Sequence, residues 1–477
     1  MPRRLGSALS LMLVLGLSAC GGGAGDGGAG GGATQAEAGR LLPSSDGIAT
    51  EYLLPDSLFN WVKSSVSPVR TIYAEANDDF ADLAGFGAAV GDARIVSLTE
   101  DTHGDANAYE LMNRQVQYLH QKKGFEVLIM ESAMFDTEAV WRSATDKGGK
   151  VIDLAPGRLF FMYSKEPSAR KVLSYVDQQR SGPNPLLLAG FDEPAGGVSS
   201  MNELLPALTQ FLTARGSVLP ADSGWANFAS VANMAAALTI TQKTNTTNFF
   251  AMARRIQAEI CPAVAPVSTN LRNDPSWWCL QVNGLVAAAQ RLPTIALTGR
   301  PPSKDPREAQ MGANALWLVQ QLYPNKKIIF WSNSTHGLRR YADRCVVEQT
   351  PCGPSEVSVP VSAISMAAET LGKSIFVVKN TALAGWLTDY TGGDNWPVFN
   401  FPDNGLLTLS QLGIKQAFVP APADPILRAR FAYMAVTKPY PSKASMPETL
   451  AREMDGMFVY PNSSPAVKTD YPVVPLP

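Results

Sequence analysis

Acidic residues and histidines in this chain follow short apolar runs. The stretch SLTEDTHGDANAYE places Glu100 and His103 directly after one such run. Glu131 ends a second run, and His336 follows a third. A glutamate beside an imidazole can orient the ring and leave its other nitrogen to take a proton from water. These residue types therefore favour acid–base or metal-assisted chemistry.

The chain has three histidines, and two of them belong to this group. Taken singly, His103 could be a structural loop residue, His336 a turn residue, and Glu131 an acid paired with an arginine. Their scarcity and their shared position after apolar runs favour a functional site. His120 differs because it lies among lysines at the end of a helical pattern, where a cation interacts favourably with the helix dipole. We interpret His120 as structural.

Several enzyme classes lack their motifs in this sequence. It has no GxSxG nucleophile elbow, no P-loop, no HExxH, and no GxGxxG between a strand and a helix. A dispersed serine triad stays open, but no serine stands out. A net charge of −2 gives no electrostatic reason for nucleic acid as a partner. The remaining interpretation is activation of water, by a general base or by a metal ion.

The apolar runs have the length and composition of buried strands. Each is rich in Val, Ile, Leu or Phe without strict alternation, which is typical of strands covered on both faces. Six runs share this pattern: 93–98, 126–132, 185–191, 293–299, 326–332 and 373–379. With helical patterns at 105–122 and 307–323, they predict an α/β fold with a largely parallel central sheet flanked by helices. Ligands of such sheets bind at the carboxyl ends of the strands, where Asp192 and Asn333 also fall.

Residues 200–292 interrupt this alternation with four helical patterns and no convincing strand. We interpret them as an all-helical insertion within one α/β domain that covers residues 48–477. Two functions of the insertion are equally open: a lid beside the active cleft, or a cover for one face of the sheet.

The N-terminal residues predict export and lipid attachment. A basic start and an apolar stretch end in LSAC, which resembles a bacterial lipobox, so we expect residues 1–19 to be a lipoprotein signal peptide and Cys20 to be lipidated. A glycine-rich tether follows at 20–47. We therefore expect a protein anchored by lipid in the bacterial cell envelope. The alternative is a plain signal peptide with an incidental cysteine.

The four remaining cysteines suit an oxidising compartment. Of the three connectivities, we favour pairing of sequence neighbours, Cys261 with Cys279 and Cys345 with Cys352. No CxxC motif occurs, so the spacing does not indicate a zinc ribbon or a redox site.

Residues 86–132 resemble the start of the erythromycin esterase family. That family has a GExxHG-type motif after its first strand, followed by a helix, a GF pair and a strand that ends in glutamate. Glu100, His103 and Glu131 match the motif residues. Further on, FWSNSTHG occupies the place of the family's W-x-H-N-x-H motif, with His336 as the second histidine. The resemblance extends roughly from residue 48 to the C-terminus.

Three positions depart from the family pattern. Thr99 stands where the family has a glycine, Asn333 replaces the first histidine of W-x-H-N-x-H, and Met112 replaces a helix arginine. Arg114 lies two residues beyond Met112 and is our candidate for the missing arginine, although two residues turn a helix by ~200°. Asp192, Asn333 and Arg114 are the residues we expect to bind substrate.

The resemblance implies an ester hydrolase that activates water and needs no cofactor, with a small-molecule ester, such as a macrolactone, as its substrate. His103 would be the general base, and Glu100 and Glu131 would orient it and the water. His336 would polarise the carbonyl oxygen, with Asn333 as a further donor. Two alternatives remain. In one, the same glutamates and histidines bind zinc or manganese. In the other, the protein is a non-catalytic, lipid-anchored binding protein with an altered site.

Overall fold

The computed structural model describes most of the chain between residues 56 and 477. The described ranges are 56–261, 267–299, 301–302, 304–339, 362–388, 390, 395–397, 412–434 and 453–477. The expected signal peptide and tether, Cys20, Cys345 and Cys352 lie outside them. Within these ranges, no helix is both long and apolar enough to cross a membrane.

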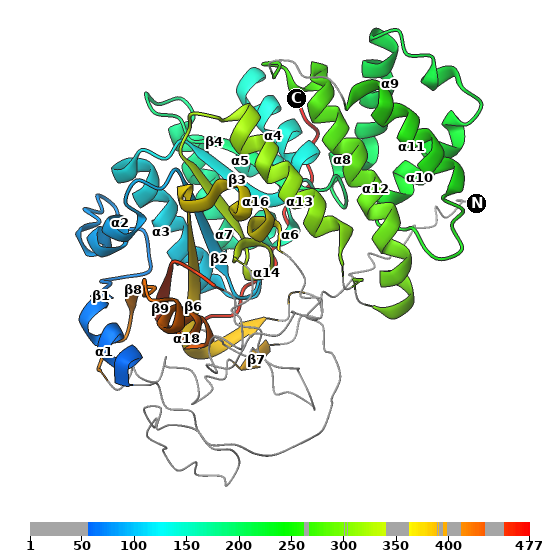
Figure 1. Cartoon of the computed structure of the whole chain (residues 1–477). Coiled ribbons are helices and arrows are strands. Elements are labelled where there is room, and N and C mark those ends of the chain that lie inside the picture. Colours follow the sequence, from blue (N-terminus) through cyan, green and yellow to red (C-terminus); the bar gives the residue numbers. More distant parts are fainter. Residues whose placement is uncertain are drawn as a thin grey trace, which may run out of the picture.

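A single mixed sheet forms the centre of the described part (Figure 1). Its strands are β1 (Ser67–Pro68), β2 (Ile95–Glu100), β3 (Val127–Ala133), β4 (Leu187–Asp192), β5 (Ile328–Asn333), β6 (Ile375–Thr388), β7 (Asn395–Pro397), β8 (Ala417–Pro420) and β9 (Gly456–Ser463). They follow the order β1-β8-β9-β6-β2-β5-β3-β4, and β7 pairs with β6. Parallel pairing joins β9, β6, β2, β5, β3 and β4 in turn, whereas β1, β7 and β8 pair antiparallel. The predicted α/β fold with a largely parallel sheet is confirmed.

Five of the six predicted strands are present, as β2, β3, β4, β5 and β6, and the sixth prediction is wrong. Residues 293–298 form the end of helix α12 (Pro275–Thr298) instead, and Gly299 is its C-cap. Leu292 and Ile295 are buried while Leu297 is 73% exposed, which is the one-sided burial of a helix. A short apolar run does not by itself distinguish a buried strand from the end of a helix.

Helices cover both faces of the sheet. Besides α12, they are α1 (Asp56–Ser65), α2 (Ala84–Val90), α3 (Ala106–Lys123), α4 (Met134–Asp146), α5 (Val151–Leu154), α6 (Phe161–Lys165), α7 (Pro167–Gln179), α8 (Val198–Asn202), α9 (Leu204–Ala214), α10 (Trp225–Ala236), α11 (Thr247–Ile260), α13 (Pro306–Trp317), α14 (Ser334–Gly337), α16 (Ala363–Leu371) and α18 (Pro425–Met434). Ile95 and Phe330 belong to the apolar core under α9–α13 and α16, whereas Val96 and Trp331 belong to the core under α3, α5 and α7. This two-sided cover explains why β2, β3 and β5 are buried at every residue.

The segment from α8 to α12 is helical, as its sequence pattern predicts, and Figure 1 shows α9–α12 grouped beside the sheet. The last helix of this group also belongs to the main core. Trp277 and Trp278 are fully buried, and their rings lie 5.8 and 6.1 Å from that of Phe135. Cys261, directly after α11, and Cys279, in α12, form a disulfide with Cα atoms 5.1 Å apart. This is the first of the two pairings expected from the sequence.

Candidate active site

The predicted glutamates and histidines converge at the carboxyl ends of neighbouring strands. Glu100 is the last residue of β2, Glu131 lies near the end of β3, and His336 lies in α14, which begins directly after β5. His103 lies in the loop between β2 and α3. The β2–β5 register places Glu100 opposite Asn333, so parallel pairing itself brings the loop after β2 beside α14.

His103 is held by its neighbours in this loop. Its Nδ1 lies 2.8 Å from Oε1 of Glu100, and both side chains are almost completely buried. The hydroxyl of Tyr109, in α3, donates to the backbone carbonyl of His103 at 2.9 Å. The carboxylate beside Nδ1 leaves Nε2 as the nitrogen that can accept a proton.

Gly104 allows the loop to lie against the end of β6. Its carbonyl accepts from the backbone N–H groups of Thr388, at 3.0 Å, and Ala466, at 2.9 Å. A Cβ at Gly104 would lie 1.9 Å from the carbonyl oxygen of Thr388. Any other residue would therefore displace the loop and the adjacent His103. The close packing of this loop against β6 therefore requires glycine at position 104, directly after His103.

Aromatic rings enclose His103. The ring centroids of Phe160, Tyr390 and Tyr163 lie 4.5, 5.0 and 5.7 Å from that of the imidazole. The hydroxyl of Tyr163 donates to Oε1 of Glu100 at 3.2 Å. Burial and the charge of Glu100 raise the pKa of Tyr163 well above its usual value, so its hydroxyl remains a donor. The rings also exclude water, which strengthens the electrostatic contacts of the imidazole.

Glu131 is the centre of the group. Its Oε2 accepts from the backbone N–H of Asn333 at 2.8 Å. Its Oε1 lies 3.3 Å from Nε2 of His336 and 3.7 Å from Nε2 of His103. Nη2 of Arg307 lies 3.4 Å from the same Oε1. Three nitrogen atoms thus surround one carboxylate oxygen, at distances longer than those of strong hydrogen bonds.

His336 has a glutamate of its own. Its Nδ1 lies 2.5 Å from Oε1 of Glu308, which belongs to the first turn of α13. Burial alone would lower the pKa of His336, but the carboxylates of Glu308 and Glu131 raise it above its ordinary value of 6.5. His336 is therefore more readily protonated near neutral pH than a free histidine.

Arg307 and Asp192 form a buried ion pair beside this group. Nε of Arg307 lies 2.9 Å from Oδ1 of Asp192, and Nη2 lies 2.5 Å from Oδ2, which is a bidentate arrangement. Burial disfavours the charged form of each side chain, but the attraction and the hydrogen bonds between the two charges are together the stronger effect. The charge of Asp192 raises the pKa of Arg307 well above its usual value, and Arg307 lowers the pKa of Asp192. The remaining terminal nitrogen, Nη1, lies 3.4 Å from Nε2 of His336.

Solved structures share this fold. A protein from Bacillus cereus is 17% identical, with a TM-score of 0.65 over 87% of this chain and 99% of that chain. A succinoglycan biosynthesis protein is 17% identical, with a TM-score of 0.61 over 86% and 98%. A histidine-to-asparagine variant of erythromycin esterase EreC, in its open conformation, is 14% identical, with a TM-score of 0.59 over 85% and 99%. The chain has the erythromycin esterase fold.

A curated relative also matches by sequence. The Bacillus subtilis (strain 168) protein named "Putative hydrolase YbfO" is 22% identical over 297 residues, which are 58% of this chain and 63% of that protein. The chain thus spans less than two thirds of that relative's length. No model of a protein family matches the chain.

In this chain the erythromycin esterase fold also brings together residues that the sequence did not single out. Arg307 and Glu308 fall in a segment that the sequence predicts to be a helix, similar to the family's helix before its second histidine motif, without a role for either residue. Charges in an exposed helical turn are ordinarily solvated. One signal could have found them. A helix that leads into a parallel strand begins at the carboxyl edge of the sheet, so its first turn lies beside the ligand site. For Phe160 and Tyr163 we find no comparable signal.

Arg114 does not belong to this site, and its assignment as a substrate-binding residue is corrected. Its guanidinium lies 2.7 Å from Asp78 and 2.6 Å from Asp82, and it donates to the carbonyl of Thr71 at 2.7 Å. Met112, at the position of the expected arginine, is fully buried in the core. Because two residues turn a helix by ~200°, Arg114 faces the segment before α2 instead of the strand ends.

Asn333 and Asp192 lie at the site, but other side chains and backbone groups engage them. Oδ1 of Asn333 accepts from the backbone N–H of Thr335 at 2.9 Å and so caps α14. Asp192 is the counter-ion of Arg307. Both residues therefore support the groups around Glu131.

Thr99 and His120 have structural contacts. The hydroxyl of Thr99 donates to the carbonyl of Val378 at 3.0 Å, and its methyl group lies so close to Gly337 that a Cβ there would be 2.4 Å away. The ring of His120 contacts the hydroxyl of Tyr175 at 2.7 Å, in agreement with its interpretation as structural. The residue that replaces the family's glycine is accommodated by a glycine in α14.

The site residues do not converge on one point as a ready-made cation site. Among the described residues, the group of acidic or histidine side chains that brings three ligand atoms within 4.8 Å of one another is Asp78, Asp79 and Asp82. Arg70 and Arg114 already bind these carboxylates. Around Glu131, nitrogen atoms of His103, His336 and Arg307 instead surround Oε1.

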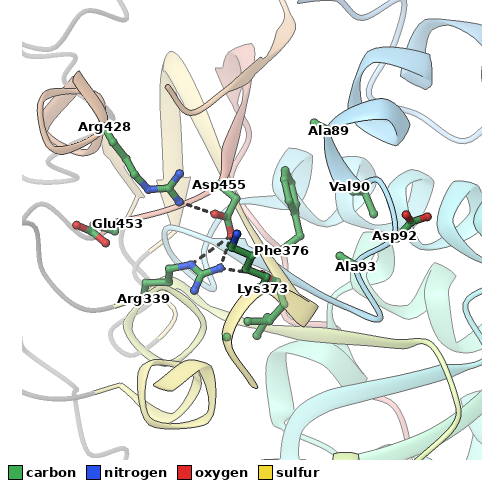
Figure 2. A pocket seen from close by; sticks show the side chains of 12 residues that line it. Ala89, Val90, Asp92, Ala93, Arg339, Lys373, Phe376, Arg428, Glu453 and Asp455 are labelled. Carbon is green, nitrogen blue, oxygen red and sulfur yellow. Dashed lines mark hydrogen bonds and ion pairs between the residues drawn. The ribbon is translucent and has the colours of Figure 1, made fainter. Parts of the chain in front are cut away.

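A cavity of about 590 Å³ lies at the other edge of the sheet, at the amino ends of β2 and β6. Figure 2 shows Arg339 and Arg428 pointing at Asp455 within it. Asp455 also accepts from the backbone N–H of Val377 at 2.8 Å. None of the residues predicted for the site lines this cavity, so the glutamate–histidine chemistry lies elsewhere.

Proposed function

We propose that this protein is a hydrolase that cleaves a carboxylic ester with a water molecule activated by His103. The observation that carries the proposal is the pair of Glu–His contacts, Glu100 with His103 and Glu308 with His336. Both histidines present Nε2 to the same oxygen of Glu131. A general base (His103) and a proton donor (His336) on either side of this oxygen suit the addition of water to a carbonyl group.

The ester as substrate class is supported by the likeness of this fold to erythromycin esterase EreC. A macrolactone is one candidate within that class, and simple esters are another. The aromatic rings around His103 favour a substrate that has an apolar group next to its ester.

His103 acts as the base in this proposal. Glu100 beside Nδ1 favours the tautomer with the proton on Nδ1, which leaves the lone pair on Nε2. The 3.7 Å between Nε2 and Oε1 of Glu131 is longer than a direct hydrogen bond, and in this mechanism the reacting water donates to both atoms. Transfer of its proton to Nε2 creates the nucleophile, and Glu100 stabilises the imidazolium that forms.

His336 acts as the electrophile. Its raised pKa favours a proton on both ring nitrogens: Nδ1 lies beside Glu308, and Nε2 lies 3.3 Å from Oε1 of Glu131 and is the donor to the substrate. A donor there stabilises the negative charge that develops on the carbonyl oxygen. Glu131 lies between the two histidines and orients the water.

Replacement of the base tests the proposal. The chain is assayed on a panel of simple esters and macrolactones, and His103→Ala is compared with Asp101→Asn. Asp101 lies in the same loop but contacts Thr381 and Lys379, outside the Glu–His group. We expect His103→Ala to lower kcat/KM by about 10²–10⁴-fold and Asp101→Asn to retain activity. Full activity of His103→Ala on an ester that the unchanged protein hydrolyses would exclude this mechanism.

We also propose that a lipid on Cys20 anchors the protein in the cell envelope. The support is the lipobox-like LSAC and the glycine-rich stretch that follows it. In a bacterial host, labelled fatty acid should enter the unchanged protein and not Cys20→Ala. Equal labelling of both would contradict this assignment.

A further inference from the structure

Arg307 directs one nitrogen at the imidazole of the site and away from its counter-ion. Nε and Nη2 bind Asp192, whereas Nη1 lies 3.4 Å from Nε2 of His336. Among the described residues, that imidazole nitrogen is the hydrogen-bond partner of Nη1. All three side chains are buried or nearly so, so these contacts replace water instead of competing with it.

Neutralising Asp192 does not require Nη1. A bidentate Arg–carboxylate pair is complete with two parallel N–H bonds, and here Nε and Nη2 make both. The pair fixes the plane of the guanidinium, and Nη1 is then held beside the imidazole without a carboxylate of its own. Asp192 is thus a positioning residue for Nη1.

The contact between Arg307 and His336 changes when His336 is protonated. In the neutral ring, with the proton on Nδ1 beside Glu308, Nε2 can accept from Nη1. In the imidazolium, Nε2 and Nη1 both carry hydrogens, and neither can accept from the other. The N–H at Nε2 also faces Oε1 of Glu131 at 3.3 Å. The N–H groups of Nη1 and Nε2 can then both point to a third atom, which must be an acceptor.

We propose that Nη1 of Arg307 and Nε2 of His336 together bind the carbonyl oxygen of the ester, so that Arg307 is a catalytic residue. This inference rests on the proposed ester hydrolysis. A guanidinium suits the role because it stays charged at every working pH and its donors are fixed in a plane. It also supplies a donor beside His336, whereas Asn333, which replaces the first histidine of the family motif, uses its Oδ1 to cap α14.

The reaction balances with these groups. The oxygen of water forms a bond to the carbonyl carbon, the π electrons move to the carbonyl oxygen, and one proton passes from water to Nε2 of His103. Nη1 of Arg307 and Nε2 of His336 hold the resulting oxyanion. When the carbonyl re-forms, the C–O bond to the alcohol breaks and the alkoxide takes the proton from His103. The products are a carboxylic acid and an alcohol.

The double variant Arg307→Met with Asp192→Asn tests the inference, and Asp192→Asn alone is the matched control. The double variant removes both charges of the Arg307–Asp192 pair, and Glu131, which also contacts Arg307, keeps its contacts with His336 and the backbone N–H of Asn333. Thermal unfolding verifies that each variant folds. We expect the double variant to lose about 10²–10³-fold in kcat with little change in KM. Asp192→Asn should lose less because the guanidinium remains.

A second measurement separates catalysis from structure. A phosphonate analogue of a hydrolysed ester places a charged oxygen where the oxyanion forms. Its affinity for the double variant should fall by the same factor as kcat/KM. Unchanged affinity in a folded variant that has lost kcat would overturn the inference, because the effect would then be structural.

The remaining outcomes distinguish this inference from the proposed function. If the double variant keeps the full kcat while His103→Ala is inactive, Arg307 does not bind the oxyanion and ester hydrolysis by His103 still holds. Full activity in both variants would contradict the proposed function itself. If the double variant does not fold, Arg307→Lys decides by the same two measurements, because one ammonium cannot pair bidentately with Asp192 and also reach the imidazole.

Discussion

His103 and His336 present the same atom, Nε2, to a single oxygen of Glu131, although they come from segments far apart in the sequence. Nδ1 of each ring lies beside a glutamate of its own, 2.8 Å from Glu100 in one case and 2.5 Å from Glu308 in the other. The site is therefore two Glu–His pairs that face each other across a third carboxylate. Their environments differ, because Arg307 contacts His336 and aromatic rings enclose His103. In the proposed mechanism, this asymmetry assigns the base to the pair with His103 and the electrophile to the pair with His336.

Glu308→Gln should shift the alkaline side of the pH–activity profile to lower pH. The charge of Glu308 raises the pKa of His336 above 6.5 against the effect of burial, so losing that charge lowers the pKa. His336 then loses its proton at a lower pH, and activity falls sooner as pH rises. Profiles of kcat/KM across the neutral range measure the shift, with the surface change Glu126→Gln as control. An alkaline limb that does not move would contradict the role of His336 as a protonated donor.

Gly104→Ala should lower both activity and stability. The added Cβ meets the carbonyl oxygen of Thr388 at 1.9 Å, so the loop must move and carry His103 with it. Overpacking of this kind costs about 1–3 kcal/mol in the free energy of unfolding, which denaturant titration measures. Gly124→Ala is the control. A side chain at Gly124 is also strained, because its φ is 70°, but an added Cβ would meet no atom within 4 Å. Gly124 lies at the other end of α3. That variant should lose stability and keep kcat, and equal loss of kcat in both would contradict the local explanation.

Removal of the Cys261–Cys279 disulfide should destabilise the protein without changing its chemistry. The bond joins residues separated by 18 positions, and a loop of that size corresponds to about 3 kcal/mol of stabilisation. The Cys261→Ser, Cys279→Ser variant and the unchanged protein are compared by denaturant unfolding, with and without a reductant. Reductant should lower the stability of the unchanged protein alone. Equal response of the two proteins would show that this bond does not form.

Chelation should leave ester hydrolysis unchanged. In the proposed mechanism, His103 activates the water and His336 with Arg307 binds the oxyanion, so each function belongs to a side chain. Activity is measured before and after dialysis against a chelator, together with the metal content of the protein. Loss of activity that zinc or manganese restores would support the metal-dependent alternative.

Five of the central strands could be predicted because each is largely buried on both faces and is therefore largely apolar. β2, β3 and β5 show this pattern plainly. The same reasoning failed at 293–299, where an apolar run ends a helix. Composition describes burial, and a run of seven residues contains too little periodicity to separate the two kinds of element.

Part of the site was predictable for a geometric reason. Glu100, Glu131 and His336 lie at or beside the carboxyl ends of strands, and parallel strands bring those ends together. Arg307 and Glu308 approach from a helix, where sequence position alone does not reveal which side chains are buried. Arg114 shows the reverse error, since a charge near an expected position found its partners in Asp78 and Asp82 instead.

The register that places Glu100 opposite Asn333 should make the proposed activity a late event in folding. Helices such as α3 form from local contacts, but β2 and β5 must close a very long loop before their ends meet, and such pairing is slow. Enzymatic activity in a refolding experiment should therefore return after the helical signal in circular dichroism. The return of activity would then report when pairing of β2 with β5 is complete.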